Sequence, residues 1–280
     1  MKTVKIVGML LIAVLFTASC QTGKNIGLQM YSLRQDIGKN SENIDSIIIK
    51  IGKMGYKYVE TANYSNDLIY NLTPEAFKEK LKAAGLYATS CHVGRSISDN
   101  PDADWAWWDK CIAVHKAAGI RYIITPSMPT PETLDGLQKY CDYYNKIGEK
   151  CKAAGLKFGY HNHAYEFEKV YDGNITMYDY MVQHTDPDKV FFELDVYWCQ
   201  KGGYPAPVLF DKYPGRFLFL HIKDEKELGA SGTMDFKAIF DKLKTAGTKY
   251  LIVEVEQYNF PPVESVKKSF DYLNSASYVK

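Results

Sequence analysis

The sequence predicts a single (β/α)8 TIM barrel, and two observations lead to this prediction: a repeated joint between helix and strand, and its regular spacing. Five segments carry an Ala-Gly or Met-Gly pair followed by a short apolar run, and such a glycine is typical of a helix end in the left-handed conformation. These glycines are Gly55, Gly85, Gly119, Gly155 and Gly247. Two further joints, at 186–190 and 213–217, place a proline where a helix must stop.

The joints recur at intervals of about 30 to 36 residues, which is the length of one strand and helix unit. With a first strand at 26–32, they predict eight strands near residues 26, 57, 87, 121, 157, 190, 217 and 250. The intervening segments have helical periodicity, as at 74–81 with Thr73 as N-cap and at 236–243 after Asp235. An open doubly wound sheet could hold the same units, but eight regular ones favour the closed barrel.

The first twenty residues predict an export signal. Lys2 and Lys5 precede an apolar run at 6–16 that is too short to span a bilayer. The run ends in Thr-Ala-Ser-Cys at 17–20, which resembles the lipobox of bacterial lipoproteins; the alternative is a buried strand with an incidental cysteine. We expect a signal peptide at 1–19, a short tether at 20–25 and the barrel at 26–280. The protein would then lie in the cell envelope, as a periplasmic or outer-membrane lipoprotein held to the membrane only by a lipid on Cys20.

The composition predicts one large globular domain with a small-molecule partner. Of the 280 residues, 46% are hydrophobic and 24% charged, which suits a chain that buries a sizeable core. The net charge of +1 gives no field that would attract nucleic acid. Apart from Cys20, five cysteines remain without CxxC spacing, so no zinc framework is expected. Buried thiols are favoured over a disulfide.

Ionisable residues stand at the C-terminal ends of six predicted strands, the end at which such barrels carry their active sites. They are Glu60, His92, His161 with His163, Glu193 with Asp195, His221 with Lys223, and Glu254 with Glu256. Any one alone is more readily a satisfied core group, but burying so many without a counter-charge would cost several kcal/mol per unpaired group. A divalent cation would hold them together, and imidazole with carboxylate suits manganese, zinc, cobalt or iron better than calcium.

At these residues the sequence resembles the xylose isomerase-like TIM-barrel superfamily of sugar phosphate isomerases and epimerases, which includes inosose dehydratase, dehydroshikimate dehydratase and endonuclease IV. The motifs are Gly-Tyr-His-Asn-His-Ala-Tyr-Glu-Phe at 159–167, Glu-Leu-Asp-Val-Tyr-Trp at 193–198 and Leu-His-Ile-Lys-Asp at 220–224. The resemblance implies one divalent metal, with manganese favoured, held by one residue from each of strands 5 to 8. Those positions are His161, Asp195, His221 and Glu254, with Glu256 as an alternative to Glu254.

Strand 5 departs from the commonest pattern, because His161 stands where the epimerases of this superfamily place a glutamate. Those epimerases use the strand 5 and strand 8 carboxylates as opposing bases, so one base is missing here. A neutral imidazole also leaves the metal a stronger Lewis acid. Both changes favour elimination or isomerisation over two-base epimerisation, and the His-x-His pattern resembles that of inosose dehydratase, which removes water beside a ketone.

The expected function is that of a divalent-metal-dependent sugar isomerase or epimerase that works through a metal-stabilised enediolate. The alternative is a metal-dependent lyase or hydratase that acts by elimination on keto-sugars or keto-glycosides. A non-catalytic sugar-binding lipoprotein would need no metal. An endonuclease IV-like repair enzyme is disfavoured, because those enzymes hold three metals with more His and Glu ligands.

Each remaining group has an expected role. His163 or Glu256 would take the alpha proton, and Lys223 would stabilise charge or protonate a leaving oxygen unless it only forms a salt bridge with Asp224 or Glu193. Glu60, His92 and Glu193 would bind substrate hydroxyls. Trp198, together with the run of Trp105, Trp107 and Trp108, would offer flat surfaces on which sugar rings stack. Arg34 is expected to be a solvated loop side chain.

Overall fold

The structure of the protein is a computed structural model that describes residues 24–280. The predicted signal peptide at 1–19 and the predicted lipid anchor at Cys20 lie outside the described residues. Within residues 24–280, no helix is both long and apolar enough to cross a bilayer.

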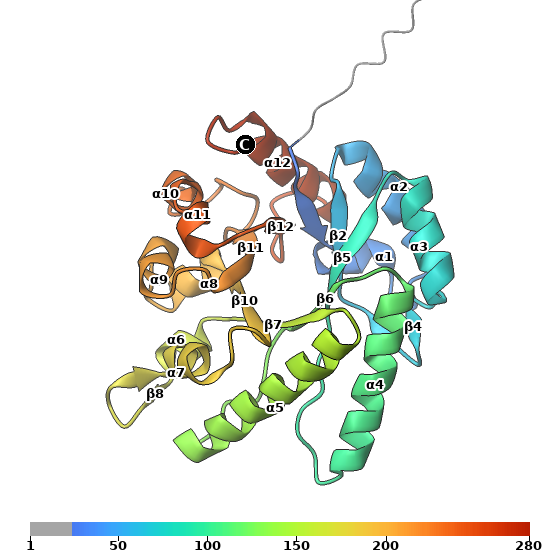
Figure 1. The fold of residues 1–280 in the computed structure, drawn as a ribbon. Coiled ribbons are helices and arrows are strands. Elements are labelled where there is room, and N and C mark those ends of the chain that lie inside the picture. Colours follow the sequence, from blue (N-terminus) through green and yellow to red (C-terminus); the bar gives the residue numbers. More distant parts are fainter. Residues whose placement is uncertain (1–23) are drawn as a thin grey trace, which may run out of the picture.

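Eight parallel strands close into one barrel, as predicted (Figure 1). The strands are β1 (Gly27–Gln29), β2 (Tyr58–Thr61), β5 (Tyr87–His92), β6 (Tyr122–Thr125), β7 (Lys157–His161), β10 (Val190–Asp195), β11 (Phe217–Lys223) and β12 (Tyr250–Glu254). Their order around the barrel is their order along the chain, and β1 pairs with both β2 and β12. This closure excludes the open doubly wound sheet.

Helices form the outer layer of the barrel (Figure 1). The longer ones are α2 (Ile44–Met54), α3 (Pro74–Ala83), α4 (Pro101–Ala117), α5 (Leu134–Ala153), α7 (Met177–His184), α9 (Ala206–Lys212) and α12 (Pro262–Ser275). Shorter pieces follow strands β1, β7, β10 and β11: η1 (Met30–Leu33), α1 (Arg34–Ile37), α6 (Tyr165–Glu168), α8 (Val196–Lys201), α10 (Phe236–Asp241) and α11 (Leu243–Ala246). The helix predicted at 236–243 is therefore interrupted at Lys242.

Two small antiparallel hairpins were missed in the sequence. They are β3 (Tyr64–Ser65) with β4 (Leu68–Ile69), and β8 (Val170–Tyr171) with β9 (Ile175–Thr176). Their turns contain Asn66 and Asp67, and Asp172 and Gly173, all with positive φ. The Asp-Gly pair is a recognised hairpin signal, so the second hairpin could have been predicted.

The predicted joints between helix and strand are confirmed. All five glycines have positive φ, from 75° at Gly85 to 107° at Gly55. At the other ends of the helices, Thr73 accepts a hydrogen bond from Ala76 N at 3.3 Å, and Asp235 accepts one from Ala238 N at 3.0 Å, so both predicted N-caps are formed. Since each helix runs back against its strand, the glycine joints lie at the end of the barrel opposite the mouth.

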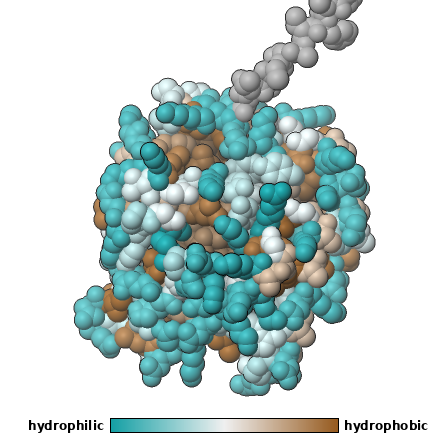
Figure 2. Space-filling model, viewed as in Figure 1, coloured by the Kyte–Doolittle hydropathy of each residue, from teal (hydrophilic) through white to brown (hydrophobic). Residues whose placement is uncertain are grey.

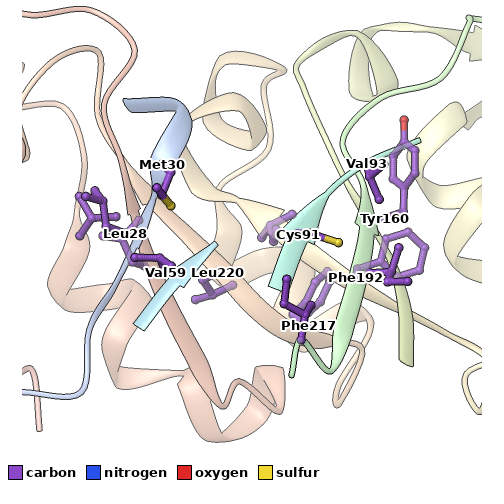
Figure 3. Packing of buried hydrophobic residues seen from close by; sticks show 14 of the residues in the cluster. Leu28, Met30, Val59, Cys91, Val93, Tyr160, Phe192, Phe217 and Leu220 are labelled. Atoms are coloured by element: carbon purple, nitrogen blue, oxygen red, sulfur yellow. The ribbon is translucent and has the colours of Figure 1, made fainter. Parts of the chain in front are cut away.

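The core has two parts, one on each side of the strands. Side chains such as Leu28, Val59 and Leu220 pack in the large cluster that also contains the buried faces of the helices (Figure 3). A smaller cluster, from five strands, fills the lower barrel and consists of Tyr58, Ile124, Phe191, Phe219 and Ile252. Gly159 makes room for it, because a Cβ there would lie 2.5 Å from the Phe191 ring. The five cysteines in the described residues are buried free thiols.

The surface seen in Figure 2 is largely hydrophilic, with small apolar patches between polar side chains. Side chains on the exposed face of an amphipathic helix are expected to be of this kind. The chemistry therefore has to be sought in the interior of the barrel rather than on its helical surface.

Candidate metal centre and active site

The interior of the barrel changes from apolar to ionisable along each strand towards the mouth. Interior positions recur every second residue, because successive side chains of a strand point to opposite faces. On four strands an apolar interior residue is followed by ionisable ones. The order is Tyr58 then Glu60 on β2, Phe191 then Glu193 and Asp195 on β10, Phe219 then His221 and Lys223 on β11, and Ile252 then Glu254 on β12. The apolar cluster thus forms the floor of a polar site.

Four side chains, one from each of β7, β10, β11 and β12, meet near the mouth: His161, Asp195, His221 and Glu254. We call them the upper cluster. Each offers one nitrogen or oxygen atom, and the four atoms all lie within 4.8 Å of one another. His161 Nε2 is 3.5 Å from Asp195 Oδ2, and His221 Nδ1 is 3.3 Å from Glu254 Oε2. These are the four residues for which the sequence predicts metal binding, so the fold brings the predicted set together.

The donor atoms of the upper cluster fit a divalent ion. His161 Nε2, Asp195 Oδ2 and His221 Nδ1 are buried and make no hydrogen bond to any of residues 24–280, which is costly for polar atoms without a ligand. Metal bonds of about 2.1 Å in tetrahedral geometry separate the ligand atoms by roughly 3.4 Å. The 3.3 Å and 3.5 Å separations agree with that spacing, and the separation of His221 Nδ1 from Asp195 Oδ2 is longer, at 4.0 Å. Asp195 Oδ1 instead accepts a hydrogen bond from Trp198 N at 2.8 Å, which fixes the carboxylate.

A second set of side chains, the lower cluster, lies beneath and comprises Glu60, His92 and Glu193. His221 Nε2 is 2.7 Å from Glu60 Oε1, and His92 Nε2 is 2.6 Å from Glu193 Oε2. Glu60 also accepts a hydrogen bond from Gln29 Nε2 at 2.8 Å. Glu60 and Glu193 are 0% exposed. This burial supports a role in positioning His221 and His92 rather than the expected contact with substrate hydroxyls.

Charges within the two clusters compensate one another. Burial disfavours charged His92, but Glu60 and Glu193 outweigh it and raise the pKa of His92 to about 9. Burial and the nearby Glu60 carboxylate raise the pKa of Glu193 to about 7, against the effect of the histidines. Burial lowers the pKa of His161 to about 3, so this imidazole is neutral near pH 7. A neutral imidazole is the form that binds metals.

The contact between Glu60 and His221 predicts an effect on metal binding. Replacing Glu60 with glutamine keeps the shape but removes the anionic acceptor that holds the His221 ring with Nδ1 free. We expect manganese affinity to fall about 10- to 100-fold, as is usual for an outer partner of a metal-bound histidine. Calorimetric titration measures this change. The control is Glu227→Gln, since Glu227 is buried but hydrogen-bonds to Ser265 and Asn259 instead. Unchanged affinity in Glu60→Gln would contradict the positioning role.

Lys223 forms a salt bridge, but with partners other than those expected. Its Nζ lies 2.9 Å from Glu254 Oε2 and also contacts Glu256, whereas Asp224 and Glu193 were the predicted partners. Asp224 instead accepts hydrogen bonds from backbone amides of its own loop. Lys223 is only 1% exposed. The register explains the pairing, because Lys223 lies directly beside Glu254 in the sheet.

Above the upper cluster lies a central cavity of about 280 Å³. Its lining is Tyr31, Ala62, His92, Pro126, Ser127, His161, His163, Glu254 and Glu256. Glu254 ends β12, while Glu256 lies beyond the strand and is the more exposed of the two, at 26% against 5% for the side chains. Burial lowers the pKa of His163. His163 is therefore a neutral group that can accept a proton, and its Nδ1 has no hydrogen-bond partner.

None of the four tryptophans expected to form an aromatic surface lines the central cavity, and only Trp198 contacts a residue that does, His163. Trp198 packs beside His163, with ring centroids 5.8 Å apart, and stands over Lys223. Trp105, Trp107 and Trp108 lie on α4, and none of them lines the central cavity. Trp108 is fully buried and donates a hydrogen bond to Tyr143 at 2.7 Å. The run packs α4 against its neighbours, since Trp105 contacts the ring of Tyr143 on α5 and Trp107 that of Tyr64 on β3.

The expectation of a solvated Arg34 is wrong. Its guanidinium donates hydrogen bonds to Tyr31 O, to Tyr258 Oη at 2.9 Å and to Glu256 O at 3.0 Å, and it stacks on the Tyr31 ring. Arg34 therefore ties the loop after β1 to the loop after β12. No local signal in the sequence indicates this, because the two loops are more than 200 residues apart.

Glu166 is a buried acid that the sequence analysis did not single out, although it lies within the motif at 159–167. It accepts hydrogen bonds from Tyr160 Oη and from His163 N, both at 2.8 Å. Burial, opposed by these hydrogen bonds, raises the pKa of Glu166 to about 7. Glu166 thus supports the backbone of His163 from below.

The raised pKa of Glu166 predicts a pH dependence of stability. A carboxyl whose pKa is raised in the folded state stabilises it below pH 4.5, and that contribution is lost as the pH rises through about 7. Between pH 4.5 and 8 we expect the unfolding free energy of the wild type, relative to Glu166→Gln, to fall by about 3 kcal/mol. Urea unfolding of both proteins in chelator measures the difference. A difference that stays constant with pH would refute the prediction.

Comparison of the sequence and the structure with known proteins shows which TIM barrels the chain is similar to. The profile of the family described as xylose isomerase-like TIM barrel matches residues 49–276. A crystal structure of a sugar phosphate isomerase/epimerase from Parabacteroides distasonis superposes with a TM-score of 0.86 at 32% identity and covers 94% of this chain and 98% of that one. A second such structure from that organism has a TM-score of 0.84 at 36% identity, over 92% and 100% of the two chains.

More distant similarities extend the comparison. The inosose dehydratase of Geobacillus kaustophilus is 22% identical over an alignment of 255 residues, and the match covers 76% of this chain and 80% of that protein. The IOLI protein, solved with a bound zinc atom, shares the fold at a TM-score of 0.70 and 14% identity, over 91% of this chain and 98% of that one.

Proposed function

The chain belongs to the xylose isomerase-like TIM-barrel family, and from this premise we propose that it is a divalent-metal-dependent enzyme that isomerises or epimerises a sugar or keto-sugar. The observation that carries the proposal is the upper cluster, in which four buried donor atoms lie within 4.8 Å of one another beneath an open cavity. Three of these atoms make no hydrogen bond within the described residues.

His161, Asp195, His221 and Glu254 would hold the metal. When bound, the ion supplies Lewis-acid chemistry: it polarises a carbonyl group and balances negative charge on the carbonyl oxygen. Manganese, zinc, cobalt and iron all suit this donor set.

His163 and Glu256 are the groups we propose for proton transfer. Both line the central cavity, where a substrate carbon beside a carbonyl would lie. His163 is neutral and can take the proton, while Glu256 lines the same cavity and can exchange a proton with the substrate; burial and Glu254 raise the pKa of Glu256 against the opposing effect of Lys223. Lys223 contacts Glu256 and Glu254 from beneath and is absent from the cavity lining, which supports a positioning role for it.

Dehydration is the second candidate function. Two observations favour it: strand β7 ends in His161, so the upper cluster has one carboxylate fewer than a two-base epimerase, and the similarity to inosose dehydratase covers 76% of this chain. Removal of water needs the same base and an acid for the leaving oxygen, and Glu256 would serve as that acid.

One experiment distinguishes the two reactions. The manganese-loaded protein is incubated with keto-sugars in deuterated water and followed by NMR. Exchange of the alpha proton without a new double bond supports isomerisation or epimerisation, whereas an unsaturated product supports elimination. His163→Asn should slow either reaction by about 100- to 10,000-fold, the range for a general base. If loaded protein gives neither signal with any keto-sugar, the proposal fails.

A further inference from the structure

A second cavity of about 220 Å³ adjoins the central cavity at the rim of the mouth. It lies between the loops that follow β1 and β2, and the two cavities share Tyr31 and Ala62 in their linings. Each alone is smaller than about 300 Å³, at which pockets for compact organic ligands usually begin, whereas the two together exceed that volume. A ligand that fills both would be larger than one that reaches the upper cluster alone.

The lining of the second cavity suits a ring better than an anionic group. Its apolar part comes from Met30, Ile37, Gly38, Ala62 and the rings of Tyr31 and Tyr70, and its polar part from Arg34, Lys39 and Asn63. Arg34 already donates hydrogen bonds to three oxygen atoms of the protein, so few of its N–H groups are left to bind a phosphate. Apolar walls with a few polar side chains are typical of sites that hold a sugar ring.

Tyr31 stands at the boundary of the two cavities and is held in place. Its side chain is 43% exposed, and Arg34 covers its ring at 4.4 Å from the centroid. Its backbone N–H donates to Gln29 Oε1 at 3.0 Å, and the amide of Gln29 in turn donates to Glu60 in the lower cluster. The backbone of Tyr31 therefore has a fixed position relative to the metal ligands, and the part of its ring that Arg34 leaves uncovered is an aromatic surface on which a sugar ring can stack.

We infer that the substrate is a glycoside with two rings: the reacting keto-sugar ring lies in the central cavity, and the ring joined to it by a glycosidic bond lies in the second cavity against Tyr31. This inference rests on the proposed function, because it assigns the reacting ring to the proposed site. The second ring contributes binding energy away from the reacting carbon.

The test compares three substrates that share one keto-hexose: the free sugar, its phosphate ester, and the disaccharide in which a second hexose is attached. The readout is kcat/KM for alpha-proton exchange or elimination with manganese-loaded protein. We expect the disaccharide to exceed the free sugar by about tenfold or more, and Tyr31→Ala to reduce that ratio by about tenfold, mainly through KM. Tyr31→Phe keeps the ring and should retain the ratio.

Tyr87→Ala is the matched control, because Tyr87 is also an exposed tyrosine, at 50%, but begins β5 at the opposite end of the barrel. It should change neither the rates nor their ratio. Equal kcat/KM for the free sugar and the disaccharide would overturn the inference, and a preference for the phosphate ester that depends on Arg34 and Lys39 would replace it with an anion subsite.

Failure of the proposed function gives a different result. If none of the three substrates reacts, saturation-transfer NMR with the loaded protein still reports which ring contacts it. Signals from the second hexose that disappear in Tyr31→Ala would support the two-ring site, and their absence in the wild type would refute it.

Discussion

Replacement of Asp195 by asparagine is expected to remove tightly bound metal and, with it, catalysis. Asparagine has nearly the same shape, and its oxygen can still accept the hydrogen bond from Trp198 N that Asp195 Oδ1 accepts at 2.8 Å. The other atom becomes an amide nitrogen, which carries protons and cannot bind a cation. We expect manganese affinity to fall by more than about 100-fold, beyond the loss caused by an outer partner. Metal content after dialysis and calorimetric titration measure it.

Asp235→Asn is the matched control for this variant. Asp235 is also an N-cap, and accepts a hydrogen bond from Ala238 N at 3.0 Å, but it does not belong to the upper or the lower cluster. It should bind metal and react as the wild type does. If Asp195→Asn keeps one tightly bound manganese per chain, Asp195 is not a ligand and the metal centre must be assigned differently.

Lys223→Met is expected to cause the largest loss of stability in the metal-free protein. Lys223 Nζ lies 2.9 Å from Glu254 Oε2 and 3.8 Å from Asp195 Oδ2, so its removal takes one of the cations away from these buried carboxylates. Breaking a buried ion pair in this way costs about 3 to 5 kcal/mol of unfolding free energy. Manganese should restore part of the loss, because it supplies positive charge to the same carboxylates. Urea unfolding with chelator and with manganese measures both effects.

The loss in Lys223→Met should also depend on pH. In the wild type, burial is outweighed by Lys223 and His221, which keep the pKa of Glu254 well below its usual value. This contribution is present above the unfolded pKa and is lost as the pH falls through the folded one. The difference between the proteins should therefore shrink in acid.

The matched control for Lys223→Met is Lys212→Met. Lys212 pairs with Asp179 at 2.8 Å, but its side chain is 44% exposed, and such pairs contribute about 0 to 1 kcal/mol. A loss for Lys223→Met no greater than that for Lys212→Met would show that the buried carboxylates do not depend on Lys223.

The barrel could be predicted because it follows from local patterns, whereas the four members of the upper cluster were selected by the resemblance to the family. The glycine after each helix indicates where the next strand begins, and the period of two residues along a strand indicates which side chains share its inner face. Once eight strands are aligned, residues at their ends must converge. The ionisable residues at the strand ends could therefore be placed at the mouth before any distance was known, and the resemblance to the family then chose His161, Asp195, His221 and Glu254 among them.

The lower cluster could not be separated from the upper one in this way, because depth in a barrel depends on the stagger between strands. The register shifts between Val59 and Glu60 and between Phe192 and Glu193. Glu60 and Glu193 both follow such a shift, Glu193 lies one inward-facing position before Asp195 on β10, and both acids contact histidines beneath the mouth. A strand pattern contains no signal for such irregularities, so these two acids were expected to face the substrate.

The hydrogen bonds of Arg34 between two loops at the rim of the mouth could not be predicted from the sequence either. Its partners Tyr258 and Glu256 belong to the last loop of the barrel, and Arg34 to the first. Only closure of the sheet brings these loops together, so an arginine in a polar segment looks solvated until the barrel is built.

The glycine joints and the side chains of the candidate active site occupy opposite ends of the barrel. This separation affects how the protein can change over evolutionary time. The positions that tolerate few residues because of their positive φ, such as Gly119 and Gly155, belong to the turns that lead into strands. The loops that leave the strands differ from one another in length and structure, as the hairpin β3–β4 and the separate short helices α8 and α9 illustrate. Insertions at the mouth can therefore alter substrate preference while the scaffold is inherited intact, which makes these loops the natural targets for library design.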